Sequence, residues 1–427
     1  AGAAAAMAAV AWNTSAAVRR AGTEGVIQAF FDEMFDHLDP YSRYDAPRVA
    51  AADEAARGGD VGIGLRLVRR HGAILAGVVN PDGPAARAGV RPGDAILTVD
   101  GKPAAHRSIA RVADWLSGPD GSELVLGWRP AGGKVAGGKT VGGKTAGGIT
   151  AGAPRLASIV RARVPPRTVF SEQLAGMLLI SITRFNRDTA TGFAAPVERA
   201  MAAHTRPDGI VLDLRGDPGG LLDQAVAVAD ALLPAGVVVR TEGRDPAASA
   251  IWRSKPGERA AGLPVVVLVD GRTASAAEIL AAALADRGRA VVVGSATFGK
   301  GLVQAFTQLP GGGELFVTWS RVLAPRGWPL EGLGVLPQVC TSLGQMAVER
   351  QLEALNDGIQ PAAAAILRER TVRAPVPPAE AVAIRSACPA AVGQELDLEV
   401  AHFLIDNPAA YAAALLPPLH DALVGAP

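Results

Sequence analysis

Hydrophobic residues gather in short unbroken runs that alternate with alanine-rich segments. Val265–Val269 and Ala290–Val293 are apolar along their whole length, which is typical of strands buried on both faces of a sheet. Between them, Ala274–Asp286 is rich in alanine and leucine and predicts a helix. Gly209–Arg215 is another buried strand, followed by a helix through Leu232. This alternation predicts an α/β core.

The pattern changes in the first third of the chain. From about Gly58 to Pro130 short strands alternate with glycine turns, including Ile74–Val79 and Glu123–Trp128 around a helix at Ser108–Leu116. After a glycine- and lysine-rich repeat, Ile159–Val164 and Met177–Ile182 are expected to be strands of the following core.

The two ends of the chain are expected to be helical. An apolar face at helical spacing comprises Val26, Ile27, Phe30, Phe31, Met34 and Phe35. Beyond Cys340 the sequence is alanine-rich, and Val400, Phe403 and Leu404 form a second such face. These helices indicate core packing or a homodimer contact rather than chemistry.

Candidate chemistry lies in the segment Leu263–Gln304. Ser275 begins the predicted helix, where unpaired N–H groups could hold an oxyanion. A serine needs a base, and no histidine lies in this segment. Lys300 has small and apolar neighbours, so desolvation could lower its pKa enough for it to accept a proton. The alternative is that Ser275 and Glu278 form only a capping box and that Lys300 is a surface lysine.

Two segments carry a resemblance to the carboxyl-terminal processing peptidases, the tail-specific serine proteases. Gly271–Ile279 is similar to their nucleophile segment, G-S-A-S-A-S-E-I, and Thr297–Gln304 to their base segment, T-F-G-K-G-x-V-Q. The resemblance implies a Ser–Lys dyad of Ser275 and Lys300, with Gln304 orienting the amine. Leu38–Tyr44 also resembles the family's L-D-P-x-S-x-Y.

The same resemblance places an oxyanion hole. Asp213–Leu222 is similar to the family's D-L-R-x-N-P-G-G-L-L, with Asp217 in the position of its asparagine. It implies that the backbone N–H of Ala276 is joined there by that of Gly219 or Gly220; a plain strand-to-helix turn is the alternative. Gln338 stands where the family commonly has aspartate.

The run from Pro84 to Leu97, G-P-A-A-R-A-G-V-R-P-G-D-A-I-L with the preceding glycine, resembles a PDZ domain. PDZ domains bind the C-terminal ends of other proteins by strand addition. The resemblance implies that the amides of Gly62, Ile63 and Gly64 bind the terminal carboxylate, and that three helix residues wall the side-chain pocket: Ile109, Val112 and Leu116.

Composition limits the compartments and the kinds of binding partner that we expect for this protein. With 42 basic and 41 acidic residues, charge gives no argument for nucleic acid. The sequence has no uninterrupted apolar run of about 18 residues, so no transmembrane helix is predicted. The sequence begins without methionine, and we expect an exported, periplasmic-type protein whose signal peptide is absent from it. Cys340 and Cys388 are either one disulfide or two buried thiols.

These observations predict a multidomain α+β protein with a PDZ domain ahead of a crotonase-like α/β peptidase core. The expected parts are an N-terminal helical region (1–57), the PDZ domain (58–130), a flexible insertion (131–156), the core (157–340) and a C-terminal helical region (341–427). The predicted activity is that of a serine endopeptidase acting on proteins with apolar C-termini, without metal or cofactor. The alternatives are a catalytically silent PDZ-bearing scaffold and an acyl-CoA enzyme on the related fold.

Overall fold

The computed structural model describes residues 2–70, 72–131 and 153–417. The protein divides into two compact units, a larger one formed by residues 1–53 and 168–427 and a smaller one formed by residues 54–167. Most of the expected insertion, residues 131–156, lies outside the described residues. No helix among the described residues is long and apolar enough to cross a bilayer.

The smaller unit is built around an antiparallel sheet in the order β3-β4-β5-β7-β8, with β6 paired to β5. Its core includes Ile63, Val112, Leu116 and Trp128. A second, two-stranded sheet joins β2 to β9. Its elements are α3 (Pro47–Gly58, shared with the larger unit), β2 (Asp60–Gly62), β3 (Leu65–Arg70), β4 (Ala73–Val79), α4 (Pro84–Arg87), β5 (Ala95–Val99), β6 (Lys102–Pro103), α5 (Ile109–Leu116), β7 (Glu123–Arg129), β8 (Arg155–Val160) and β9 (Ala162–Val164).

The strands expected at residues 159–164 are present as β8 and β9, but they belong to the smaller unit and not to the core that follows. Residues 159–164 were expected to begin the peptidase core, but β8 pairs with β7 along its whole length, from Trp128↔Arg155 to Glu123↔Val160. Ile159 is 3% exposed in the core of the smaller unit. This pairing was not evident from the sequence, because the glycine- and lysine-rich repeat separates β7 from β8 along the chain.

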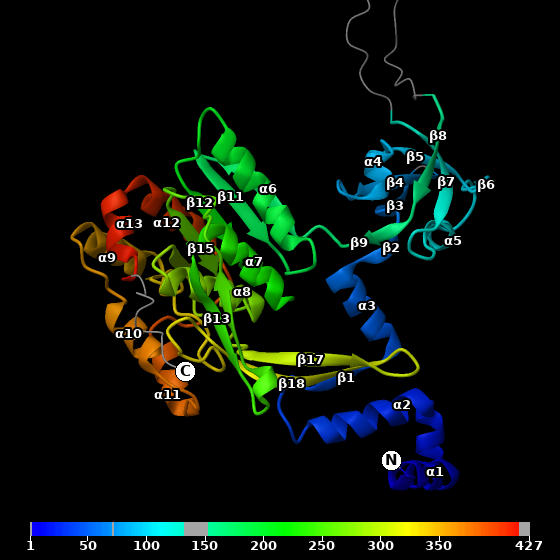
Figure 1. The fold of residues 1–427 in the computed structure, drawn as a ribbon, viewed down its shortest axis with the longest axis horizontal. Coiled ribbons are helices and arrows are strands. Elements are labelled where there is room, and N and C mark those ends of the chain that lie inside the picture. Colours follow the sequence, from blue (N-terminus) through cyan, green and yellow to red (C-terminus); the bar gives the residue numbers. More distant parts are fainter. Residues whose placement is uncertain (1, 71, 132–152, 418–427) are drawn as a thin grey trace, which may run out of the picture. The chain divides into compact units, whose positions relative to one another are not determined.

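The larger unit contains a six-stranded sheet in the order β10-β11-β12-β15-β16-β19 (Figure 1). From β11 to β19 the strands are parallel, and β10 is an antiparallel edge. Its strands and the helices that connect them are β10 (Val169–Leu174), β11 (Met177–Ile182), α6 (Thr189–Ala202), β12 (Ile210–Asp213), α7 (Leu222–Leu232), β15 (Val265–Val269), α8 (Ala276–Asp286), β16 (Val291–Gly294) and β19 (Val339–Cys340).

Alternate residues of these strands face two separate apolar cores. Val265, Val267 and Val269 pack with α6, α7 and α8 on one face, and Val266 and Leu268 pack with α12 and α13 on the other (Figure 1). The unbroken valine runs therefore reflect burial on both faces, as predicted. The C-terminal helices are α9 (Gln345–Asn356), α10 (Ala363–Thr371), α11 (Pro378–Arg385), α12 (Glu395–Asp406) and α13 (Pro408–Ala414).

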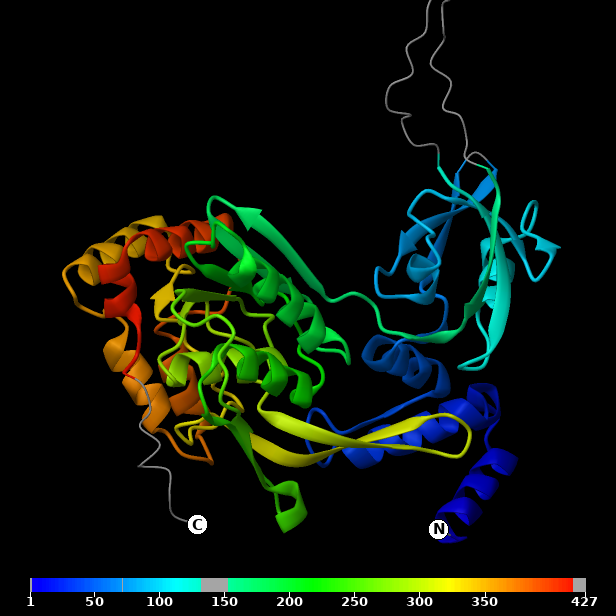
Figure 2. The same cartoon turned by 45° about the horizontal axis from the view of Figure 1, so that its top comes forward.

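A second sheet of the larger unit carries a long hairpin (Figure 2). Its order is β1-β18-β13-β14, and β17 pairs with β18. The N-terminal residues join it because β1 pairs with β18 and Phe31 stacks on Tyr44 at 4.9 Å between ring centroids. The elements are α1 (Gly2–Thr14), α2 (Ala16–Phe35), β1 (Arg43–Asp45), β13 (Gly236–Glu242), η1 (Pro246–Ala248), β14 (Ala250–Ser254), β17 (Leu302–Gln308) and β18 (Glu314–Leu323).

The N-terminal apolar face is only partly covered. Phe35 is 4% exposed, whereas Phe30 is 53% and Met34 40% exposed. The face predicted from helical spacing therefore divides into a packed side and an exposed side.

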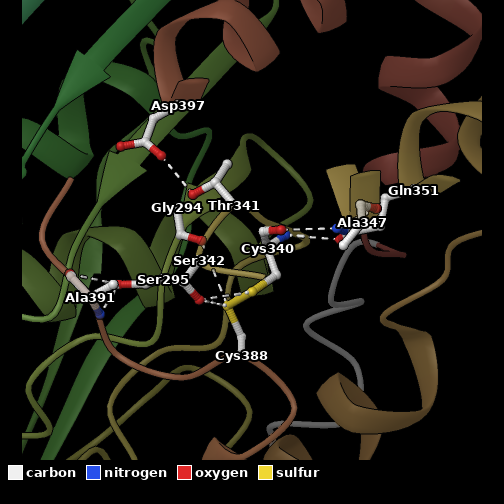
Figure 3. Close-up of a disulfide and its surroundings, with 10 residues drawn as sticks. All are labelled: Gly294, Ser295, Cys340, Thr341, Ser342, Ala347, Gln351, Cys388, Ala391 and Asp397. Atoms are coloured by element: carbon white, nitrogen blue, oxygen red, sulfur yellow. Dashed lines mark hydrogen bonds between the residues drawn. A yellow bond between two sulfur atoms is a disulfide. The ribbon is translucent and has the colours of Figure 1, made fainter. Parts of the chain in front are cut away.

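A disulfide joins the core to the C-terminal helical region (Figure 3). Cys340, at the end of β19, is bonded to Cys388 with a Cα–Cα distance of 5.7 Å. Close by, Ser295 Oγ donates to the carbonyl of Ala391, which also accepts from the Gly271 N–H. The segment after Cys388 is thus hydrogen-bonded to the segments that follow β15 and β16. Of the two possibilities for these cysteines, the structure shows the disulfide.

Candidate active site

Ser275 lies at the turn between β15 and α8 with an unusual backbone. Its φ is 56° and its ψ −117°, a conformation that non-glycine residues rarely adopt. This sharp turn places the serine at the N-cap of α8, next to Ala276, whose N–H is at the first helical position and has no intrahelical acceptor. Strain of this kind is often found where a side chain must be presented to a ligand.

Glu278 connects the nucleophile segment with the lysine segment. It is fully buried, and its Oε2 accepts from the backbone N–H of Ser275 (2.7 Å) and of Lys300 (2.9 Å). Its Oε1 accepts from the Gly299 N–H (2.7 Å) and from the Thr297 hydroxyl. Ser275 and Lys300 therefore have backbone nitrogens within two hydrogen-bond lengths of each other. Burial raises the pKa of Glu278, against the effect of these four donors.

The capping box predicted as an alternative is present together with the unusual backbone conformation of Ser275. Ser275 and Glu278 form the reciprocal pair that caps a helix. The two interpretations of Ser275 offered by the sequence are thus not exclusive, since the cap is what ties the serine to the lysine segment.

Lys300 occupies a partly buried position lined by an aromatic ring. Its Nζ lies 5.1 Å from the centroid of the Tyr41 ring, and no carboxylate among the described residues forms an ion pair with it. Burial lowers the pKa of Lys300, and Arg43 lowers it further, whereas Glu331 and Asp53 act in the opposite direction. A lowered pKa increases the fraction of neutral amine, the form that can accept a proton.

Gln304 is directed at neighbouring groups of the hairpin. Its Nε2 donates to the Leu302 carbonyl (3.2 Å) and to Thr318 Oγ1 (3.3 Å). Thr318 Oγ1 in turn donates to Asp39 (2.8 Å), which also binds the Ser42 hydroxyl. Among the described residues, no hydrogen bond joins Gln304 to the Lys300 amine.

This network shows what the Leu38–Tyr44 segment does, which its sequence did not reveal. Asp39 and Ser42 fasten the segment to β18, and Tyr41 is thereby held against Lys300. Burial raises the pKa of Tyr41 to about 12, so its phenol stays protonated. The aromatic residue in the motif was the available signal.

The glycine turn after β12 lies against the serine. A Cβ built on Gly219, whose φ is 91°, would meet the Ala276 nitrogen and the Ser275 Cβ, each at 2.8 Å. Gly220 is equally tight, since a Cβ there would lie 2.0 Å from the Phe185 carbonyl oxygen. The structure therefore brings Ser275, Ala276, Gly219 and Gly220 together. The Gly219 N–H donates to Asp217 Oδ1 (2.7 Å).

In the smaller unit, the six residues predicted to bind a peptide divide into two sets. Gly62–Gly64 lead into β3, which is an edge strand of its sheet and contacts α5. On α5, Val112 and Leu116 are buried in the core together with Ile63, and Ile109 is partly exposed. Val112 and Leu116 thus lie on the buried side of α5. They would form the floor of a peptide site between α5 and β3 rather than an exposed wall.

Comparison with known proteins decides the family. A model of Peptidase family S41 matches residues 176–341, and a PDZ domain model matches residues 76–130. A carboxy-terminal-processing protease of Bartonella bacilliformis is 31% identical over 319 residues, which cover 74% of this chain and 69% of that protein. The chain belongs to the carboxy-terminal processing proteases.

A second curated relative and a solved structure are also similar to the chain. The carboxy-terminal processing protease CtpA of Bacillus subtilis is 31% identical over 322 residues, covering 74% of this chain and 64% of its own. A solved structure titled photosystem II D1 C-terminal processing protease is 28% identical, covers 78% of this chain and 86% of its own, and has a TM-score of 0.41. The two family models and the curated relatives confirm the predicted fold and the predicted class, a serine-type peptidase with a PDZ domain. Nothing in these matches favours the silent scaffold.

Proposed function

We propose that this carboxy-terminal processing protease cleaves peptide bonds with Ser275 as nucleophile and Lys300 as general base. The observation that carries the proposal is the shared carboxylate oxygen of Glu278, which holds the backbone of both residues at one point. A serine on a strained turn and a lysine with a lowered pKa are what such a dyad requires.

The reaction proceeds in two balanced stages. Ser275 Oγ attacks the substrate carbonyl carbon while the neutral Lys300 amine takes the hydroxyl proton, and the resulting ammonium gives that proton to the departing amine. Water then attacks the acyl ester, with Lys300 accepting its proton and returning it to Ser275. The oxyanion is placed near the N–H groups of Ala276 and of Gly219 or Gly220.

We propose that Gln304 orients the Lys300 amine. Because Nε2 donates to Thr318 and Leu302, the amide oxygen is the atom that would accept from the Lys300 amine. A glutamine that spans the hairpin and the lysine would hold the base in line with the serine.

The smaller unit is proposed to select substrates by their C-terminal tails. The exposed edge of β3 beside α5 is suited to strand addition, with the amides of Gly62–Gly64 near the terminal carboxylate. Apolar side chains of the tail would pack beside Ile109, over the floor of Val112 and Leu116.

Compartment and assembly complete the proposal. The disulfide supports an exported, oxidising location such as the periplasm. The exposed apolar side chains of α1 and α2, among them Met7, Val10 and Phe30, support a homodimer through the N-terminal helices.

The deciding experiment compares the wild type with Ser275→Ala and Lys300→Ala on an unfolded protein that ends in an apolar tail. We expect both variants to lose about a thousand-fold or more in kcat/KM. Wild-type activity should rise with pH through the pKa of Lys300, because only the neutral amine accepts a proton. Retained cleavage by Ser275→Ala would exclude the proposed nucleophile.

Tail recognition is tested separately with the full-length Ser275→Ala variant, which binds without cutting. Its affinity for a fluorescent apolar tail peptide is compared with that for the same peptide carrying a C-terminal amide. We expect weaker binding of the amide; equal affinity would exclude recognition of the carboxylate while leaving the dyad untouched.

A further inference from the structure

Asp217 is a buried acid in the turn that lies against the nucleophile. Its side chain is 0% exposed, and its backbone carbonyl accepts from the Ala274 N–H at 2.9 Å. Its Oδ1 accepts from the Gly219 N–H, whereas its Oδ2 is buried and has no hydrogen-bond partner among the described residues. A buried carboxylate oxygen without a donor is costly in its ionised form.

A second buried acid in the neighbouring turn shows the contrast. Asp270 is also 0% exposed, but its oxygens accept from several backbone N–H groups, including those of Gly216 and Gly393, and from the Arg272 guanidinium. Burial alone would raise the pKa of Asp270, yet these donors hold it below its usual range. Both side chains are inaccessible to solvent, but Asp217 lies deeper and accepts fewer hydrogen bonds, so burial raises its pKa whereas the donors around Asp270 lower the pKa of that acid.

The charged groups around Asp217 do not neutralise it. From the segment after β11, Arg184 is the cation that favours its ionised form, and the Arg184 guanidinium also pairs with Asp53. On the turn after β15, Arg272 is engaged by Asp270. In its own turn, Arg215 is engaged by two other acids, Asp213 and Asp397.

Burial consequently raises the pKa of Asp217 to about 8, against the Gly219 hydrogen bond and Arg184. The acid is therefore a neutral carboxyl at neutral pH and an anion in alkaline solution. The donor to its side chain is the Gly219 N–H, and Gly219 lies so close to the nucleophile that an added Cβ would be 2.8 Å from both the Ser275 Cβ and the Ala276 nitrogen.

We propose that Asp217 is a positioning residue of the oxyanion site and that it supports catalysis only as the neutral carboxylic acid. The inference rests on the proposed function. In the neutral form Oδ1 accepts the Gly219 N–H and Oδ2 carries a proton, so the turn is held without charge. In the ionised form a negative charge lies close to Gly219, where a second negative charge develops on the substrate, and the two repel each other in a site with little solvent.

The proposal gives the enzyme a bounded pH range. On the acid side activity is lost as Lys300 becomes charged, and on the alkaline side it is lost as Asp217 becomes charged. An asparagine at position 217 would keep an acceptor for Gly219 and a donor in place of Oδ2, and it has no charge at any pH.

The test is the pH profile of kcat/KM for wild type and Asp217→Asn on one unfolded protein substrate. Whatever its absolute value, we expect the ratio of variant to wild type to be constant with pH below about pH 7 and to grow about tenfold per pH unit well above about pH 8. The matched control is Asp245→Asn, because Asp245 makes the same hydrogen bond to the N–H two residues on (2.8 Å) but is not buried. Its ratio should stay constant.

A ratio for Asp217→Asn that does not change with pH would overturn the inference and leave the dyad intact. Wild type that shows no Ser275-dependent cleavage at any pH would instead remove the proposed function. A second measurement uses only the wild type and is therefore independent of whether the variant folds. The rate at which a fluorophosphonate labels Ser275 should fall above about pH 8. A rate that keeps rising would also overturn the inference.

Discussion

At the scale of single residues, the site depends on small backbone clearances. Gly219 shows this most clearly, because its positive φ and its contacts with Ser275 and Ala276 leave no space for a side chain. One of the atoms that an added Cβ would meet, the Ala276 nitrogen, is a donor in the proposed mechanism, and another is the Cβ that carries the Ser275 hydroxyl.

Gly219→Ala should therefore reduce kcat/KM by about a hundred-fold or more, the usual effect of disturbing an oxyanion site. Gly327→Ala is the matched control, because Gly327 also has a positive φ (85°) but no atom within 4 Å of an added Cβ. Both variants would lose about 1 kcal/mol or more of stability through backbone strain, and Gly219→Ala would lose more because of its steric overlaps. Similar activity in the two would mean that the Gly219 contacts do not matter to the chemistry.

Asp217 should also affect stability. Because burial raises its pKa from an ordinary value near 4 to about 8, the folded protein keeps a proton there that the unfolded protein releases. Stability should therefore fall between these two pH values, with a contribution of up to about 1.4 kcal/mol per pH unit, and level off above.

Asp217→Asn removes that contribution, so urea unfolding at about pH 5 and about pH 9 should show a smaller loss for the variant. Glu369, whose pKa burial also raises to about 8, contributes to both proteins and cancels in the comparison. An identical loss in both would show that Asp217 is ionised in the folded state across this range.

Single residues also show where sequence reasoning reached its limit. The dyad segments were visible because each is a local motif. Glu278 was visible only as a cap, since its bonds to Gly299 and Lys300 join segments about 20 residues apart. The charge state of Asp217 could not be predicted, because it depends on which donors the fold brings to each oxygen.

At the scale of elements, α8 is the part that organises the site. It is buried along its whole length, presents Ser275 at its N-cap and Glu278 in its first turn, and packs against α7 and β16. Its burial was predictable from composition, whereas its connection to the lysine loop was not.

Glu278→Gln should loosen this connection. An amide has one acceptor oxygen, so its NH2 group would face N–H donors that the carboxylate now satisfies. We expect a loss of stability of about 3 kcal/mol and a fall in kcat/KM. The control is Glu353→Gln, an exposed glutamate on α9. Wild-type melting and kinetics in Glu278→Gln would contradict the bridging role.

The hairpin β17–β18 was the element least accessible to prediction. Its strands carry exposed apolar residues such as Phe306 and Trp319, so their alternation gave no clear inner face. Its partner, β1, lies about 270 residues earlier in the sequence and has only three residues.

At the scale of the whole molecule, the strand pairing of the smaller unit decides how it can be removed. Deleting residues 58–130 would leave β8 and β9 without their partners β7 and β2. Excision between Gly59 and Pro165 removes both strands of the β2–β9 pair and of the β7–β8 pair. No strand of the smaller unit is then left without its partner.

A deletion of residues 60–164 joined by a short glycine linker should thus remain monodisperse in gel filtration, whereas a deletion of residues 58–130 should aggregate. Aggregation of the 60–164 deletion would contradict the strand pairing on which this excision is based.

The disulfide has a consequence for how damage to this protein would be detected. Cys340 and Cys388 enclose the stretch that forms α9, α10 and α11, so a cut anywhere in it leaves two pieces joined by one covalent link. For a protease that can meet its own copies, such a nick would not change the band on a non-reducing gel. Only reduction would release the C-terminal fragment, and a preparation judged intact without it could already be a two-chain molecule.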